Sequence, residues 1–222
     1  MLRKLIIVLV ISLYGCSSVP FRHSDYLSFD GIDPQSLRTG FSENLPQEFE
    51  LLNSAIFRYY SFNFPALGVV RADTLKKSLN LAGFNHLGVM LFEISLDTEG
   101  KVDCKYALPE FAKHKDFASY VLSDIKKIYF DRIPPKSAEV RLEKRRVVFK
   151  DSLNDVATEY VFSGEGRFLA EKNYYEKRKK IWSVFYYEYT FKDGKIYPQG
   201  IVLKHYKYGY KLIIRLKEIR SL

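Results

Sequence analysis

Apolar and polar side chains alternate along most of the chain from about residue 45 onward. Short runs rich in Tyr, Phe, Val, Ile and Leu are separated by turn residues such as Asp97-Thr98-Glu99-Gly100 and Asp193-Gly194, a pattern typical of β-hairpins. The segment 17–44 shows no sustained period and is predicted to be a loop and tether. The pattern predicts about eleven strands, at 47–60, 65–73, 76–83, 87–97, 100–107, 138–150, 156–163, 167–175, 180–192, 195–204 and 209–219.

One segment has a different period. Between Lys113 and Phe130, apolar residues recur at intervals of three and four, which predicts an amphipathic helix. Pro134-Pro135 then ends the helical pattern. Because strands and helices do not alternate, the predicted fold class is mainly β, a curved antiparallel sheet with helical cover.

Within three of the predicted strands, the alternation places apolar side chains on one face of the sheet. Such a face forms either a closed core or the lining of a hydrophobic groove. The side chains concerned are Met90, Phe92, Ile94 and Leu96 in the first strand, Ile181, Phe185, Tyr187, Tyr189 and Phe191 in the second, and Tyr210, Leu212, Ile214 and Leu216 in the third.

The first sixteen residues have the architecture of a lipoprotein signal peptide. Arg3 and Lys4 precede an apolar run, residues 5–13, that is too short to span a membrane. The sequence Leu13-Tyr14-Gly15-Cys16 is similar to a lipobox, which predicts cleavage after residue 15 and a stable acyl anchor on Cys16. Ser17 is typical of outer-membrane lipoproteins, so the predicted location is the periplasmic face of the outer membrane.

The net charge and the sequence motifs limit the classes of function that the protein can have. Removal of residues 1–15 takes Arg3 and Lys4 away and brings the formal net charge from +9 to +7, a basic surface that suits anionic headgroups or an acidic partner. Export excludes nucleic acid as a partner. The four histidines are far apart, and the sequence has no Cys-x-x-Cys, Gly-x-Ser-x-Gly or phosphate-binding glycine-rich motif. We therefore predict that the protein is not an enzyme and uses no cofactor or metal.

The order of segments resembles that of LolB, the outer-membrane receptor for lipoproteins. Asn85-His86-Leu87-Gly88 before the strand 89–96 is similar to the family's Asn/Ser-Pro-Leu-Gly, with His86 in place of proline. A helix ending at Ile133-Pro134 and closing strands within 182–219 follow in the family's order, and several phrases look closer still to an uncharacterised family of LolB-like lipoproteins. The resemblance covers residues 48–222. It implies an open half-barrel whose concave apolar face is capped by helices and holds acyl chains.

This resemblance sets the expected function. We expect a monomer that binds a lipid, an acyl chain or an acylated partner in a hydrophobic groove and receives it from a periplasmic carrier protein. The expected domains are a signal peptide at 1–15, a lipidated tether at 16–44 and a LolB-like half-barrel at 45–222. The expected ligand-binding residues are Leu87, Met90, Phe92, Ile94, Phe185, Tyr187, Leu212 and Ile214.

Two alternatives stay open at this point. In the first, the sheet is packed shut, and the protein is a structural or protein-interaction lipoprotein without a cavity. In the second, the segment 87–150 is an interaction module, because its strand, Thr98-Glu99-Gly100 turn, strand and helix resemble the C-terminal domain of TonB-type proteins.

Overall fold

Twelve antiparallel strands form one sheet in the computed structural model, which describes residues 20–22 and 27–220. The strands are β1 (Glu48–Tyr59), β2 (Phe62–Asp73), β3 (Ser78–Phe84), β4 (Met90–Leu96), β5 (Val102–Ala107), β6 (Glu139–Glu143), β7 (Arg146–Leu153), β8 (Val156–Ser163), β9 (Phe168–Glu176), β10 (Lys179–Lys192), β11 (Lys195–His205) and β12 (Tyr210–Arg220). Their order in the sheet is β5-β4-β3-β2-β1-β12-β11-β10-β9-β8-β7-β6. The first and last strands therefore pair with each other in the middle of the sheet, with Tyr59 opposite Tyr210.

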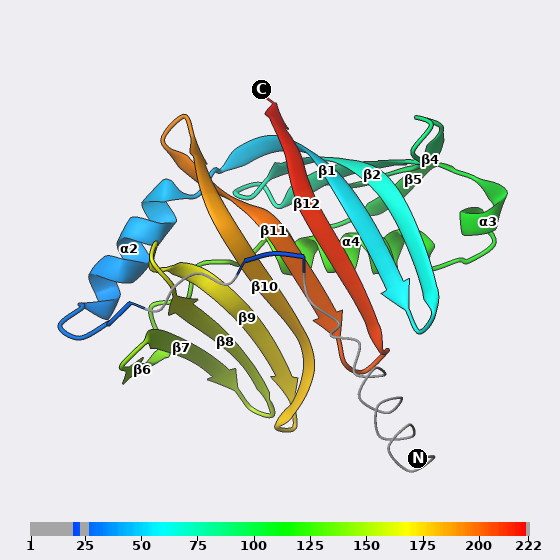
Figure 1. Ribbon diagram of the computed structural model, residues 1–222. Coiled ribbons are helices and arrows are strands. Elements are labelled where there is room, and N and C mark those ends of the chain that lie inside the picture. Colours follow the sequence, from blue (N-terminus) through cyan, green and yellow to red (C-terminus); the bar gives the residue numbers. More distant parts are fainter. Residues whose placement is uncertain (1–19, 23–26, 221–222) are drawn as a thin grey trace, which may run out of the picture.

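Helices cover the concave face of this open sheet. The chain leaves β5 at one edge, passes through α3 (Pro109–Ala112) and α4 (Phe117–Tyr129), and returns as β6 at the other edge. Figure 1 shows α4 lying across the back of the sheet in this view. The apolar stripe of α4 buries Leu122, Ile125 and Ile128 in the main core. The predicted fold class, mainly β with an open half-barrel and helical cover, is confirmed.

Two elements differ from the prediction. The segment 138–150 is not one strand, because a two-residue turn at Lys144-Arg145 separates β6 from β7. A helix, α2 (Pro34–Asn44), also lies within the predicted loop and tether. It begins where the Asp33 carboxylate accepts hydrogen bonds from two backbone N–H groups, and its buried Phe41 packs edge-on against Phe162 at 5.1 Å.

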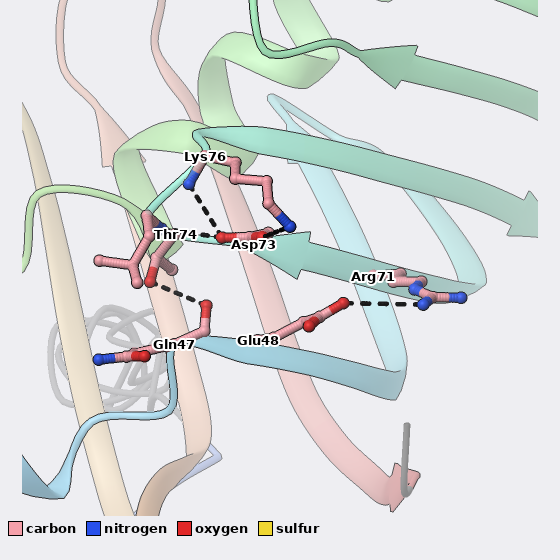
Figure 2. A network of polar contacts seen from close by, with 7 residues as sticks. Gln47, Glu48, Arg71, Asp73, Thr74 and Lys76 are labelled. Atoms are coloured by element: carbon pink, nitrogen blue, oxygen red, sulfur yellow. Dashed lines mark hydrogen bonds and ion pairs between the residues drawn. The ribbon is translucent and has the colours of Figure 1, made fainter.

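A polar network fixes the end of the sheet where β1 begins and β2 ends (Figure 2). Thr74 Oγ1 donates to the Gln47 carbonyl oxygen at 2.9 Å, and Lys76 Nζ lies 2.9 Å from an Asp73 carboxylate oxygen. The Lys76 backbone N–H also donates to Asp73, and this bond is the main cause of the lowered pKa of Asp73. This end of the sheet is therefore polar and conformationally defined.

The topology does not support a separate module at 87–150. The hairpin β4–β5 lies at one edge of the sheet and the hairpin β6–β7 at the other, so the segment is divided between the two ends of one continuous structure. Within the described residues, no helix has the length and apolar character needed to cross a membrane.

Candidate functional site: a cleft beside helix α4

Polar contacts from two central strands hold α4 on the concave face. Tyr210 on β12 donates from its hydroxyl to Asp124 Oδ2 at 2.5 Å, and the same carboxylate pairs with Lys127 at 2.7 Å. The Tyr186 hydroxyl on β10 donates to the carbonyl oxygen of Ile128 at 2.8 Å. Apolar packing is not directional, whereas hydrogen bonds are, so these bonds set the position of the helix over the sheet.

A third strand contributes a buried lysine at the end of α4. Lys172 on β9 is 5% exposed, and its Nζ donates to the carbonyl oxygens of Phe130 at 2.8 Å and Lys127 at 3.3 Å. Carbonyls in the last turn of a helix lack intrahelical partners, so the ammonium group caps α4. Burial lowers the pKa of Lys172 to about 8, against an opposing effect of the Asp131 carboxylate. An ammonium group has three N–H donors, so one remains for another acceptor.

A cleft of about 530 Å³ opens between α4, the β4–β5 hairpin and strands β8 to β10. This volume lies within the range of roughly 300–1,000 Å³ that is usual for ligand pockets. The apolar part of its lining is Leu96, Val102, Leu122, Tyr160, Tyr174 and Trp182. Tyr174 and Trp182 stack with ring centroids 5.2 Å apart, which gives the cleft a flat aromatic wall.

The charged part of the lining is predominantly positive. Lys126, Lys127 and Lys172 face the cleft together with a single carboxylate, that of Asp131. The Tyr160 hydroxyl is uncharged at neutral pH, as any tyrosine is, and burial raises its pKa further, to about 12. The cleft therefore combines an apolar wall with a cationic side, which suits an amphipathic molecule with an acidic head.

Most of the predicted ligand-binding residues on the concave face are packed inside the protein. Ile94 and Ile214 are buried in the main core, and Leu212 packs half-buried against it. Phe92 has ring contacts with Phe111 at 5.8 Å and Phe117 at 5.2 Å, so it fixes α3 and α4 to β4. None of these four side chains lines the 530 Å³ cleft.

Phe185 and Tyr187 lie on the opposite, outer face, so the prediction that they share the core face of their strand is wrong. Glu188 has a left-handed backbone conformation, with φ of 52°, which interrupts the alternation along β10. As a result Tyr186 and Tyr189 both pack in the main core, whereas Phe185 and Tyr187 join a separate outer cluster.

The outer cluster is built around Phe21. Its ring stacks on Tyr187 at 5.3 Å and lies so close over Gly200 that a Cβ there would be 2.3 Å from it. Arg215 lies over the same ring at 4.7 Å and donates to the Pro20 carbonyl oxygen at 2.6 Å. Residues 20–22 are therefore docked on the outer face of the sheet, on the side away from α4 (Figure 1).

The remaining predicted residues either do not line the cleft or lie outside the part of the chain that the structure describes. Leu87 is 76% exposed at the β3–β4 turn, where the Asn85 side chain accepts from its backbone N–H at 2.9 Å. Met90 begins β4 and is half-buried. Cys16, the predicted lipidation site, lies outside the described residues.

The cleft residues themselves were not predicted from the sequence. The alternation of β9 places Lys172 and Tyr174 on one face, and a lysine on that inward face is the signal that could have pointed to the site. The lining comes from five strands and a helix far apart in the chain, so no local motif contains it.

The fold and the cleft define a class of protein, an antiparallel half-barrel with a helix across its concave face. The sequence profile of the family described as "Protein of unknown function (DUF3261)" matches residues 68–218. This match covers more than half of the chain, so the protein belongs to that family. A comparison with curated proteins gives no match.

Solved structures share the fold at low sequence identity. A LolA superfamily protein from Nitrosomonas europaea superposes with a TM-score of 0.50 at 10% identity, over 86% of this chain and 96% of that chain. A structure described as an outer membrane lipoprotein-sorting protein domain from Vibrio parahaemolyticus superposes with a TM-score of 0.50 at 7% identity, over 83% and 90%. These similarities extend to the fold of the LolA superfamily, and the closer resemblance to LolB stays a prediction.

Proposed function

We propose that the protein is an outer-membrane-anchored lipoprotein that binds an acyl chain bearing an acidic head in the cleft beside α4. The observation that carries this proposal is the cleft itself, about 530 Å³ in volume, with an aromatic and aliphatic wall and three lysines. The acyl chain would lie along Tyr174 and Trp182. The head would accept from Lys126, Lys127 and the remaining N–H of Lys172.

The position of α4 suits reversible loading. The helix is held by an apolar stripe and by hydrogen bonds from Tyr210, Tyr186 and Lys172, each worth about 1–3 kcal/mol net. A modest displacement of α4 would widen the cleft without breaking the sheet, because the backbone pairs of the sheet do not involve the helix. The fold similarity to proteins described as lipoprotein-sorting supports a carrier or receptor role.

The other parts of the proposal rest on the sequence. The lipobox-like Leu13-Tyr14-Gly15-Cys16 supports a lipid anchor, and Ser17 supports the outer membrane. We further propose that the protein acts as a monomer, is not an enzyme, and receives its ligand from a periplasmic carrier.

Native mass spectrometry tests ligand binding directly. The mature chain, residues 16–222 with Cys16→Ser so that no acyl group is attached, is incubated with a bacterial lipid extract. We expect a retained acyl lipid or fatty acid at a ratio of one per chain. Ser123→Phe, which places a ring in the cleft from α4, should abolish retention.

Ser152→Phe on β7 is the matched control, because Ser152 is exposed and does not line the cleft. If neither the parent chain nor the control retains lipid, the alternative of a structural or interaction lipoprotein with a packed interior is favoured. The complete burial of Ile94 and Ile214 is the observation that supports this alternative.

A further inference from the structure

Five aromatic side chains are exposed on two neighbouring hairpin tips. The β1–β2 turn presents Tyr59, Tyr60 and Phe62, and the β11–β12 turn presents Tyr206 and Tyr208, with Tyr60 the most exposed at 85%. The two tips are adjacent because β1 pairs with β12 up to Tyr59 opposite Tyr210. Both turns lie at the same end of the sheet, at the lower right of Figure 1. We call these five residues the aromatic tips.

The charged side chains of the two segments that carry the aromatic tips are all positive. Segments 57–64 and 204–212 contain no Asp or Glu, but carry Arg58, Lys204, Lys207 and Lys211. Mutual repulsion is evident at Lys204, whose pKa is lowered by burial and then by the nearby Lys211. The adjoining β9–β10 turn adds exposed cations at 177–179. Such a surface complements a negatively charged plane.

The opposite end of the sheet has a different character. There the β2–β3 turn is fixed by the Asp73, Thr74 and Lys76 contacts of Figure 2, in which cations are matched by carboxylates. This turn exposes one apolar side chain, Leu75, at 70%, and the β10–β11 hairpin at the same end exposes the ring of Phe191 at 63%. Five exposed rings on two adjacent turns distinguish the aromatic tips from that end and indicate a surface specialised for contact.

We infer that the aromatic tips dock in the headgroup region of an anionic lipid bilayer. Tyr and Phe rings at a water–hydrocarbon boundary place their apolar bodies among acyl chains, and tyrosine hydroxyls remain hydrated. Lys207 and Arg58 then lie level with lipid phosphates. Free phosphate would make no use of exposed aromatic rings, and an apolar protein partner would make no use of the surrounding cations. An anionic membrane uses both the aromatic rings and the cations.

The docked segment at Phe21 is consistent in length with this orientation. Four residues lie between Cys16 and Phe21, so the two positions are five steps apart, a reach of roughly 17 Å for extended chain. Gly200, under Phe21, is six residues along β11 from Tyr206, roughly 20 Å. An anchor on Cys16 could therefore enter the bilayer that the aromatic tips contact. The inference does not depend on ligand binding in the cleft.

Vesicle co-sedimentation tests the surface without the anchor. The mature chain with Cys16→Ser is mixed with vesicles of phosphatidylcholine alone or with about one third phosphatidylglycerol. We expect binding to the anionic vesicles that weakens as salt is added. The double variant Tyr60→Ser, Phe62→Ser should lower the partition coefficient between water and vesicles by about tenfold or more, because it removes two rings that the bilayer would bury. Lys207→Glu should lower it several-fold on anionic vesicles only.

Leu75→Ser is the matched control, since it removes an equally exposed apolar side chain from the opposite end. Its partition coefficient should equal that of the parent. Circular dichroism checks that each variant is folded, and Tyr60→Trp, which keeps a ring, should show a blue-shifted emission with vesicles. Equal binding of the double variant and the parent would overturn the inference. So would concentration-dependent dimerisation that the same double variant abolishes, because the tips would then bind a second copy.

Discussion

At the scale of single residues, Lys172 joins the stability of the interior to the chemistry of the cleft. It caps α4, lines the cleft and is buried with a pKa lowered to about 8. An unfolded chain binds the same proton with a pKa of about 10.4. Above pH 8 the unfolded lysine therefore holds more of this proton than the folded lysine does, and the contribution of Lys172 to stability rises with pH until the pKa of the unfolded lysine is reached.

This linkage gives a measurable pH effect. Between pH 7 and 8.5 the free energy of unfolding should rise by about 0.8 kcal/mol from Lys172 alone. Urea denaturation at each pH measures this rise, in a range where few tyrosines of the unfolded chain ionise. Lys172→Met should lack this rise. An equal rise in Lys172→Met would show that another group is responsible.

Gly200 is a second residue with a specific structural role. An alanine Cβ there would overlap the ring of Phe21, so Gly200→Ala should displace residues 20–22 from the outer face. The lost burial predicts a decrease of about 1–2 kcal/mol in the free energy of unfolding, measured by urea denaturation.

Gly68→Ala on β2 is the matched control, because a Cβ there meets its nearest atoms at 4.0 Å. It should leave the stability unchanged or slightly raised. Amide hydrogen exchange at Phe21 and Arg22 that stays slow in Gly200→Ala would contradict the docking of Phe21.

At the scale of elements, the strands and the helix α4 were predictable because turn residues and periodicity mark them. Helix α2 was not predicted, and its segment was assigned to the tether. Asp33-Pro34 is a typical start of a helix, but Gly40 and the polar residues between leave few apolar positions to mark a helical period. The turn at Lys144-Arg145 was missed because charged residues continue the polar positions of a strand. The face assigned to Phe185 and Tyr187 was wrong for a different reason: the left-handed Glu188 changes which face the following residues of β10 occupy, and such an interruption has no clear signature in sequence.

The contact of α4 with β12 gives a prediction at this scale. Tyr210→Phe removes the hydroxyl that donates to the Asp124 carboxylate and should lower the free energy of unfolding by about 1.5–3 kcal/mol. Amide hydrogen exchange of α4 should speed up about fivefold or more, whereas the strands should keep their rates. Tyr120→Phe, at an exposed position on the same helix, is the control and should exchange like the parent. Unchanged exchange in Tyr210→Phe would show that apolar packing alone holds the helix.

At the scale of the whole molecule, the two ends and the two faces of the half-barrel have separate tasks in this account. The concave face holds α4 and the cleft, the outer face holds the segment after the proposed anchor, and the aromatic tips face the bilayer. The fold could be inferred from the order of hairpins. The cleft could not be inferred, because it forms only where α4 lies against strands about 17 to 63 residues away in the chain.

The chain contains one tryptophan, Trp182, and it lines the cleft, so its fluorescence reports most directly on whether acyl chains bind there. We predict that a brominated fatty acid quenches Trp182 emission saturably in the mature chain with Cys16→Ser, and that Ser123→Phe removes this quenching. Emission that stays constant as the brominated fatty acid is added, or that falls equally in Ser123→Phe, would contradict binding of acyl chains in the cleft.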